Sequence, residues 1–455
     1  MNRPQHVDPE WAWSPYSPDA QTPWTRALAA HLYRRAGFAA TTQQLDDAVA
    51  QSPGEVLQDL MQPGRESQDY ANDIDDLARA NLATGDPKKM SAWWLYRMLT
   101  TPAQLQEKAT LFWHGHFATG AEKVEDADLV YGQYRLLREH ATGDFGALLH
   151  GISRDPAMLI YLDSATNRKS HPNENYAREI MELFALGEGA YTEQDIRELA
   201  RCFTGWEVRR GKFRFNRYQH DFGEKTVLGT SGKLGGDEGV DVVLAQSTAP
   251  QFIVRKLIRF YVCDEPEASD ELVAPLAREF RDSGLQVGPV IQRILSSNLF
   301  FSSHSRGRKV RSPIELGVGF LRALNGTTGI YELAAGMAQI GQELFYPPNV
   351  KGWDGGRTWI NSSTLLGRAN LIRSLLESDK TRFSGATLEE LVDREGLQKP
   401  HEIVDWLAEL LFAVPVPETV RERVTGVLES NDGDRENRLR NALTVLCTLP
   451  EFQLA

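Results

Sequence analysis

The sequence predicts a mainly α-helical protein, and three observations support this prediction. Helix-start signals recur along the chain, each pairing an N-cap residue with a first-turn proline or with a capping-box acid or amide. Between these signals, apolar residues repeat with the period of an amphipathic helix. Long alternation of Val, Ile and Thr, which would indicate strands, is nearly absent. We therefore expect one large helical domain with long irregular loops and one short β-hairpin.

Local signals place the expected elements along the chain. The start signals stand at Thr101-Pro102, Asp155-Pro156, Ser312-Pro313 and Thr387. Helical periodicity covers residues 27–36, 55–61, 92–99 and 252–262. The best strand candidate runs from Trp206 to Gln219 around Gly211-Lys212, which predicts a hairpin near residues 206–220. Residues 226–248 are rich in glycine and residues 343–362 lack a regular pattern, so we expect loops in both segments.

The expected domain organisation is one main domain with a part at each end. Residues 1–23 are rich in proline and tryptophan and should form an extended N-terminal segment. Residues 24–380 should form the main helical domain, which carries the motif blocks described below. A polar stretch over residues 380–400 leads into a C-terminal helical portion, residues 381–455, which we expect to pack on the main domain.

Composition and charge limit the classes of function. The 455 residues are 41% hydrophobic and 25% charged, as in a soluble globular protein. No window approaches about 18 uninterrupted apolar residues, so no membrane span is expected. A net charge of −12 without a long basic tract disfavours a nucleic-acid binder. Residues 1–20 lack an apolar core, which predicts no secretory signal and a cytoplasmic location. The three cysteines are far apart in apolar runs, which indicates free thiols in a reducing compartment.

A polar helix face is the first candidate site. The stretch from Asn173 to Trp206 indicates two helices joined by a glycine-rich turn. One arc of the first helix carries polar residues without lysine, and the opposite side is apolar. We expect this arc, formed by Asn175, Arg178, Glu179 and Glu182, to lie in a cleft shielded from water. Two carboxylates held close together would raise one pKa, as a general acid requires. The alternatives are a surface ion pair at Arg178 and a buried structural network.

Histidines form the second candidate site. His114 and His116 would point about 200° apart in a helix, so they could not chelate one ion there. A helix that ends at Gly115 could instead present both rings to one cavity, with His220 as a third ligand. This set would suit zinc, iron or manganese. The alternative is that the rings pack against aromatic residues and bond to backbone carbonyl groups.

The loop from Asn349 to Trp359 is the third candidate site. Its glycines allow a ligand to approach the backbone closely, and its tryptophans and cations suit sugars and anions. The spacing is not that of a P-loop, because no Gly-Lys-Ser/Thr follows. A packed structural loop explains the same residues equally well.

Five sequence blocks stand out: HLYRRAGF (31–38), LFWHGHF (111–117), the stretch 173–206, QHDFGEKTVLG (219–229) and YPPNVKGWDGGRTWINSSTLLGR (346–368). Together they resemble one large bacterial family, which is known only as domain of unknown function 1800. They run in family order from residue 31 to the final LPEFQLA, nearly the whole chain. The resemblance implies no known chemistry. Family members are often exported, and this chain departs from them because it lacks a visible signal.

Two classes of function remain. The first is an enzyme with a polar cleft that acts on an anionic, sugar-like or glycan-like small molecule, with a divalent metal as a possible cofactor. The second is a non-catalytic helical binding or assembly protein, and the oligomeric state is not predicted. The catalytic candidates are Glu179, Glu182, Arg178 and His220, the binding candidates are Asn173, Asn175, Lys225, Lys351, Trp353 and Arg357, and the metal candidates are His114, His116 and His220. Motifs typical of serine hydrolases, dinucleotide oxidoreductases and zincins are absent.

Overall fold

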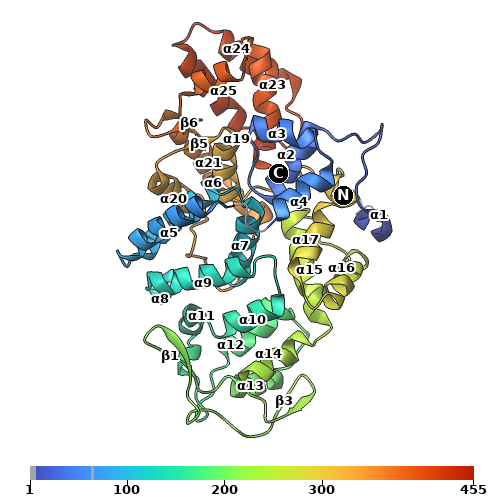
Figure 1. Ribbon diagram of the computed structural model, residues 1–455, viewed down its shortest axis with the longest axis vertical. Coiled ribbons are helices and arrows are strands. Elements are labelled where there is room, and N and C mark those ends of the chain that lie inside the picture. Colours follow the sequence, from blue (N-terminus) through green and yellow to red (C-terminus); the bar gives the residue numbers. More distant parts are fainter. Residues whose placement is uncertain (1–6, 63–65) are drawn as a thin grey trace.

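Helices make up 60% of the structure, which confirms the predicted mainly α-helical single domain (Figure 1). The computed structural model describes residues 7–62 and 66–455. Helix α7 lies near the centre of the molecule, with α23 to α25 towards one end and the hairpins of β1 and β3 at the other. The N-terminal third contains α1 (Pro9–Trp13), α2 (Arg26–Ala36), α3 (Thr42–Val49), α4 (Pro53–Met61), α5 (Gln68–Leu82), α6 (Pro87–Thr100), α7 (Gln104–His116), α8 (Ala121–Val124) and α9 (Ala127–Glu139).

The middle of the chain forms the end of the molecule that carries the hairpins (Figure 1). Its helices are α10 (Phe145–Ser153), α11 (Pro156–Tyr161), η1 (Ser164–Thr166), α12 (Asn175–Glu179), α13 (Glu193–Cys202) and α14 (Gly236–Leu244). Between α12 and α13 lies a π-helix, η2 (Ile180–Ala185). The strands are β1 (Trp206–Arg209), β2 (Lys212–Phe215), β3 (Lys225–Val227) and β4 (Thr230–Gly232).

The remaining elements return through the centre to the C-terminal end. They are α15 (Thr248–Tyr261), α16 (Asp270–Asp282), α17 (Val287–Leu295), α18 (Asn298–Phe301), α19 (Pro313–Ala323), β5 (Gly326–Thr327), α20 (Ile330–Gln339), η3 (Gly356–Trp359), α21 (Ser362–Glu377), β6 (Arg382–Phe383), α22 (Leu388–Arg394), α23 (Pro400–Leu411), α24 (Glu418–Glu429), α25 (Arg435–Cys447) and η4 (Pro450–Gln453). Helix α23 packs on α2, and α25 packs on α21. No helix in the described ranges is both long and apolar enough to cross a bilayer.

The predicted hairpin is present as the antiparallel pair β1 and β2. Trp206 pairs with Phe215 and Val208 with Phe213, so one face of the hairpin is apolar. Arg210 and Gly211 both have positive φ, which matches the tight turns preferred in two-residue hairpins. The turn therefore lies one residue before the expected position.

Several expected irregular segments contain regular structure. The segment 226–248, expected as a loop, holds most of the β3–β4 hairpin, all of α14 and the start of α15. Residues 7–23 contain the short helix α1, whereas residues 1–6 lie outside the described residues. The start signal at Thr101 does not cap α7, which begins at Gln104, and the Thr101 hydroxyl accepts from the Ala103 N–H instead.

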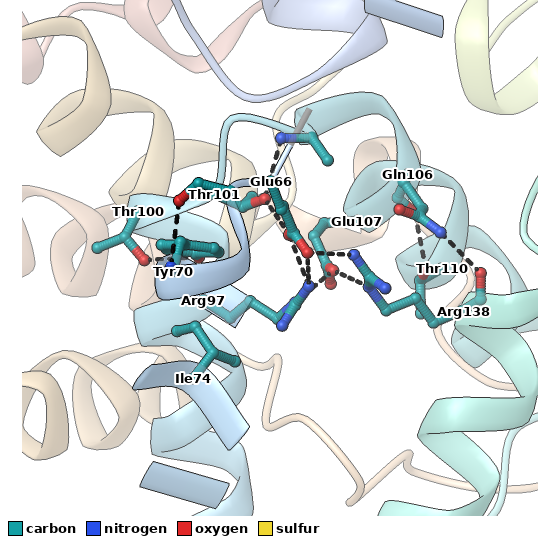
Figure 2. Close-up of polar contacts among 12 residues, drawn as sticks. Glu66, Tyr70, Ile74, Arg97, Thr100, Thr101, Gln106, Glu107, Thr110 and Arg138 are labelled. Atoms are coloured by element: carbon teal, nitrogen blue, oxygen red, sulfur yellow. Dashed lines mark hydrogen bonds and ion pairs between the residues drawn. The ribbon is translucent and has the colours of Figure 1, made fainter. Parts of the chain in front are cut away.

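A buried network of four charges holds α6, α7 and α9 together (Figure 2). Glu107 of α7 is fully buried and accepts hydrogen bonds from Arg97 Nε and Arg138 Nε, each at 2.7 Å. Glu66 pairs with the same two arginines at 2.6 and 3.0 Å. Two carboxylates thus pair with two guanidinium groups, and this pairing offsets the free-energy cost of burying the charges.

The block 31–38 has a structural role at the other side of the core. Arg35 is buried and donates to the carbonyl oxygens of Val262 at 2.7 Å and Ala455 at 3.0 Å. Arg311 donates to the carbonyl oxygen of Leu454 at 2.9 Å. Buried guanidinium groups therefore tie the last residues to α2 and α15 through backbone carbonyl groups.

Candidate functional site

A pocket with a volume of about 230 Å³ opens between the end of α7, the second half of α15 and the loop 342–359. It mixes cations, carboxylates and aromatic rings. Its lining residues are Leu111, Phe112, Gly115, His116, Lys256, Arg259, Phe260, Asp264, Lys309, Ser312, Glu315, Gln342, Lys351, Trp353, Asp354, Gly355 and Trp359. Two of the family-like blocks, 111–117 and 346–368, thus meet at this pocket.

Glycines explain how the loop reaches α7. Gly352 has φ of +78°, and a Cβ at this position would collide with the carbonyl oxygen of Gly115. Only glycine adopts this conformation without strain and permits this close approach. Gly115 also lines the pocket, and a Cβ on it would meet no atom within 4 Å. The loop therefore docks by a glycine-to-glycine contact that leaves open space beside α7.

Lys256 and His116 form a hydrogen-bonded pair at the pocket wall. Lys256 Nζ lies 3.0 Å from His116 Nδ1 and donates to the carbonyl oxygen of Leu183 at 3.1 Å. His116 Nε2 lies 2.9 Å from the carbonyl oxygen of Phe184, so Nε2 carries the proton and Nδ1 accepts from Lys256. Both carbonyl groups belong to the π-helix η2, a kind of turn that recurs at functional sites.

Burial sets the charge of this pair. Burial, and then the neighbouring Arg259 guanidinium, lower the pKa of Lys256 to about 7. Burial and then Lys256 hold the pKa of His116 well below its ordinary value, so His116 is neutral. The Phe252 ring lies 4.6 Å from Lys256 Nζ. Near neutral pH the pocket therefore holds a lysine that is part amine and part ammonium.

The cations of the pocket fall into two groups. Lys309 pairs with Asp264 at 3.0 Å and is neutralised by it. Lys256, Arg259 and Lys351 line the same pocket, and none of them forms a salt bridge with any carboxylate in the described ranges. The lining thus holds four cationic side chains against the carboxylates of Asp264, Glu315 and Asp354, and Glu179 interacts with Lys351 from beside the pocket.

The histidines expected to bind a metal do not converge. Helix α7 continues through His116 instead of ending at Gly115, so the two rings of the pair point apart. His114 Nε2 accepts from the Phe345 N–H at 3.0 Å, and His220 Nδ1 bonds to the carbonyl oxygen of Thr204 at 2.8 Å. In the part of the chain that the structure describes, no group of three or more His, Cys, Asp or Glu residues could hold a metal ion. The expectation of a shared three-histidine pocket is thereby corrected.

The predicted polar helix face is split between surface and interior. Asn175 is exposed, and Arg178, Glu179 and Glu182 are half-buried. Arg178 makes a bidentate pair with Glu193 of α13, with both N–O distances 2.8 Å. This pair joins two helices, which fits the structural alternative for Arg178.

Glu179 differs from its neighbours on this face. Burial, and then the Glu182 carboxylate, raise the pKa of Glu179, whereas Arg178 and Lys351 oppose the rise. Lys351 lines the pocket, so the Glu179 carboxylate interacts electrostatically with a residue at the pocket rim. Glu182 instead accepts a hydrogen bond from the Tyr191 hydroxyl at 3.1 Å.

Three further candidates are not part of the pocket lining and make structural contacts. Lys225 is buried, and its Nζ donates to the carbonyl oxygens of Asp221, Gly223 and Leu234. Asn173 accepts from the Asn175 N–H at 2.9 Å and donates to the carbonyl oxygen of Asp163 at 3.2 Å, which shapes the turn before α12. Arg357 has an 82% exposed side chain and pairs with Glu265.

Sequence reasoning found the loop residues Lys351 and Trp353 but missed Lys256 and Arg259. Both lie on α15, where a lysine and an arginine at helical spacing resemble an ordinary solvent face. The one available signal was the apolar ring of Phe252 four residues before Lys256, which shields its ammonium from water.

A comparison with protein-family models matches residues 31–454 to a family described as "Protein of unknown function (DUF1800)". No curated protein and no solved structure matches the chain. The family match covers both the pocket segments and the buried arginines Arg35 and Arg311, and it agrees with the resemblance seen in the sequence blocks. The chain therefore belongs to the DUF1800 family of proteins of unknown function.

Proposed function

We propose that this protein is an enzyme whose central pocket binds a small anionic molecule. The observation that carries the proposal is the set of three basic side chains, Lys256, Arg259 and Lys351, that line one pocket and form no salt bridge among the described residues. Basic side chains that are not held in a salt bridge at a partly enclosed site attract an anion from solution. The volume of about 230 Å³ suits a small metabolite.

Each part of the pocket supplies one element of recognition. Arg259 and Lys351 are exposed at the rim and are placed to meet a carboxylate or phosphate group. Trp353, Trp359 and Phe260 offer apolar faces to the body of the ligand, as in sugar-binding sites. Glu179 has a raised pKa and interacts with Lys351, which suits a proton donor or acceptor near the rim.

Binding of defined anions tests this proposal. Phosphate, lactate and pyruvate are titrated into the protein at low ionic strength, and binding is followed by calorimetry and by the shift in melting temperature. Arg259→Ala and Lys351→Ala should each weaken binding about tenfold, the loss expected for one charge-assisted hydrogen bond. Arg373→Ala and Lys399→Ala remove the same charges from exposed surface pairs and serve as matched controls. The proposal fails if none of the anions binds, or if the control variants weaken binding equally.

A second candidate function, non-catalytic assembly, is favoured by exposed aromatic residues beyond β1. Phe215, Tyr218 and Phe222 are 47%, 78% and 57% exposed, within a segment rich in arginine. Large exposed aromatic side chains close together are typical of protein interfaces. If this surface mediates self-association, the double variant Tyr218→Ser, Phe222→Ser should have a lower sedimentation coefficient than the wild-type protein. If the wild type and the double variant both sediment as monomers, this candidate is wrong.

A further inference from the structure

We infer that Lys256 is the nucleophile of the central pocket and that it condenses with a small anionic carbonyl compound, such as a 2-oxo acid, to form an imine. This inference rests on the proposed function, because it takes the pocket as the site of an anion. It goes further by naming the reacting atom, Lys256 Nζ, and the class of substrate.

The hydrogen bonds of Lys256 leave one tetrahedral position of Nζ unused. Two acceptors face Nζ, namely His116 Nδ1 at 3.0 Å and the Leu183 carbonyl oxygen at 3.1 Å. A neutral amine has two N–H groups and one lone pair, so these acceptors take both hydrogens. The lone pair then occupies the remaining position on a side chain that lines the pocket. An amine with a free lone pair on a side chain that lines the pocket can attack the carbonyl carbon of a bound ligand.

The acceptors are fixed by surrounding structure. His116 donates from Nε2 to the Phe184 carbonyl oxygen, which leaves Nδ1 only as an acceptor. Leu183 and Phe184 are consecutive residues of η2, so the π-helix positions both contacts together. Because both nitrogens of His116 are occupied, this ring acts as a positioning residue for the amine.

Other buried lysines of the chain show a contrasting arrangement. Lys225 Nζ has three carbonyl oxygens around it, which match the three N–H groups of an ammonium ion. Lys108 pairs with the Glu315 carboxylate at 2.6 Å, which also stabilises the ammonium form. Lys256 has two acceptors and no carboxylate partner among the described residues, and Arg259 lies close enough to disfavour its ammonium form. A lysine with these neighbours is the kind that serves as an amine nucleophile.

The proposed step balances without a further reactant. The Nζ lone pair attacks the carbonyl carbon, and a proton released from Nζ passes to the former carbonyl oxygen. This carbinolamine then loses the hydroxyl oxygen as water, with a second proton from Nζ, and leaves a C=N bond between substrate and Lys256. During these steps the substrate carboxylate would be held by Arg259 and Lys351, the two cations at the rim.

Reductive trapping on the whole protein tests the inference. The protein is incubated with pyruvate and sodium cyanoborohydride, which reduces an imine to a stable secondary amine, and peptides are mapped by mass spectrometry. The expected result is a pyruvate adduct at Lys256, with the exposed Lys399 unmodified under the same conditions. The purified Lys256→Arg variant should give no adduct at position 256. Excess lactate should reduce trapping in the wild type, because lactate is an anion that lacks the ketone group with which the amine reacts.

Two outcomes separate this inference from the proposed function. If lactate and pyruvate both bind but no adduct forms at Lys256, or if Lys399 is modified equally, the nucleophile assignment is overturned and the binding proposal stands. If neither anion binds, both fail. A ligand-free measurement adds a second check: the rate of trinitrophenylation of Lys256 should reach half its maximum near pH 7, whereas Lys399, whose pKa is raised by the Glu402 carboxylate, should react only at a much higher pH. A midpoint near 10 for Lys256 would overturn the inference.

Discussion

Gly115 is a helical glycine whose missing side chain leaves space beside the pocket. Alanine favours an α-helix over glycine by up to about 1 kcal/mol, and a Cβ at this position meets no atom within 4 Å. Gly115→Ala should therefore raise the free energy of unfolding while it narrows the pocket and weakens anion binding. Urea denaturation and calorimetry would measure the two effects. A destabilised variant with unchanged binding would contradict this account of Gly115.

Asp155 makes stability depend on pH. It caps α11, and its Oδ1 accepts from the Met158 N–H and from Gln133 Nε2, yet burial raises its pKa to about 6. An unfolded chain releases this proton near pH 4, so the folded state binds more protons between about pH 4 and 6. The contribution of Asp155 to the free energy of unfolding should therefore fall by about 3 kcal/mol as the pH rises from about 4 to about 6, because the folded state holds the proton more tightly than the unfolded state.

The variant Asp155→Asn isolates this effect. Asparagine keeps an oxygen acceptor for the cap but does not titrate. The free energy of unfolding of the wild type should fall relative to that of the variant as the pH rises from about 4 to 6, and the difference should stay constant above pH 6. A pH-independent difference, measured by urea denaturation across the range, would show that folding does not change the pKa of Asp155.

At the residue scale, sequence reasoning identified loop groups better than helix groups. Lys351 and Trp353 stood out because glycine, tryptophan and charge cluster in a short segment. Lys256 gave no comparable signal, because its environment depends on carbonyl groups of residues 183 and 184, more than seventy positions earlier. Such a contact is invisible in local periodicity.

The four-charge network joins three helices through a single carboxylate. Glu107 contacts Arg97, Arg138, Trp94 and Tyr134, and its side chain is fully buried. Glu107→Gln should lower the free energy of unfolding by roughly 3–5 kcal/mol, because it leaves buried guanidinium charge uncompensated.

Glu377→Gln provides the matched control for this element. Glu377 pairs with Arg373 on the exposed face of α21, at a similar distance of 2.7 Å but with a side chain that is 59% exposed. Its loss should change stability by less than about 0.5 kcal/mol. Equal effects of the two substitutions in urea denaturation would mean that burial does not set the strength of the network.

At the element scale, capping signals predicted helix starts well where the cap is local. Ser312 with Glu315 and Thr387 with Glu390 form the expected capping boxes. The β3–β4 hairpin was missed because its strands are only three residues long and lie in a glycine-rich segment. The π-helix was missed because its apolar pattern differs little from that of an α-helix over one turn.

Across the whole molecule, one continuous hydrophobic core runs from Ala12 to Phe452. The contacts of Arg35 and Arg311 with the last residues add polar links between sequence-distant parts. We therefore expect a single thermal unfolding transition that coincides by circular dichroism and by tryptophan fluorescence. Two transitions would instead indicate that residues 381–455 unfold as an independent unit, and limited proteolysis near residue 380 would locate the boundary.

At this scale the sequence predicted the class of fold but not the arrangement of its helices. Helix periodicity and caps are local properties, whereas the meeting of α7, α15 and the loop 342–359 depends on packing between distant segments. The family-like blocks include both pocket residues and structural arginines, which only their contacts distinguish.

The π-turn between Ile180 and Ala185 gives the helix one more residue than an α-helical path of the same span would need. Loss of a single codon in this stretch would let the chain close ordinary α-helical hydrogen bonds, so the helix should survive the deletion. The carbonyl groups of Leu183 and Phe184 would then be turned away from Lys256 and His116. The number of residues in this one turn, independent of their identity, thus sets whether the carbonyl groups of the helix face Lys256 and His116. We expect the deletion variant to fold and its Lys256 to react like an ordinary surface lysine.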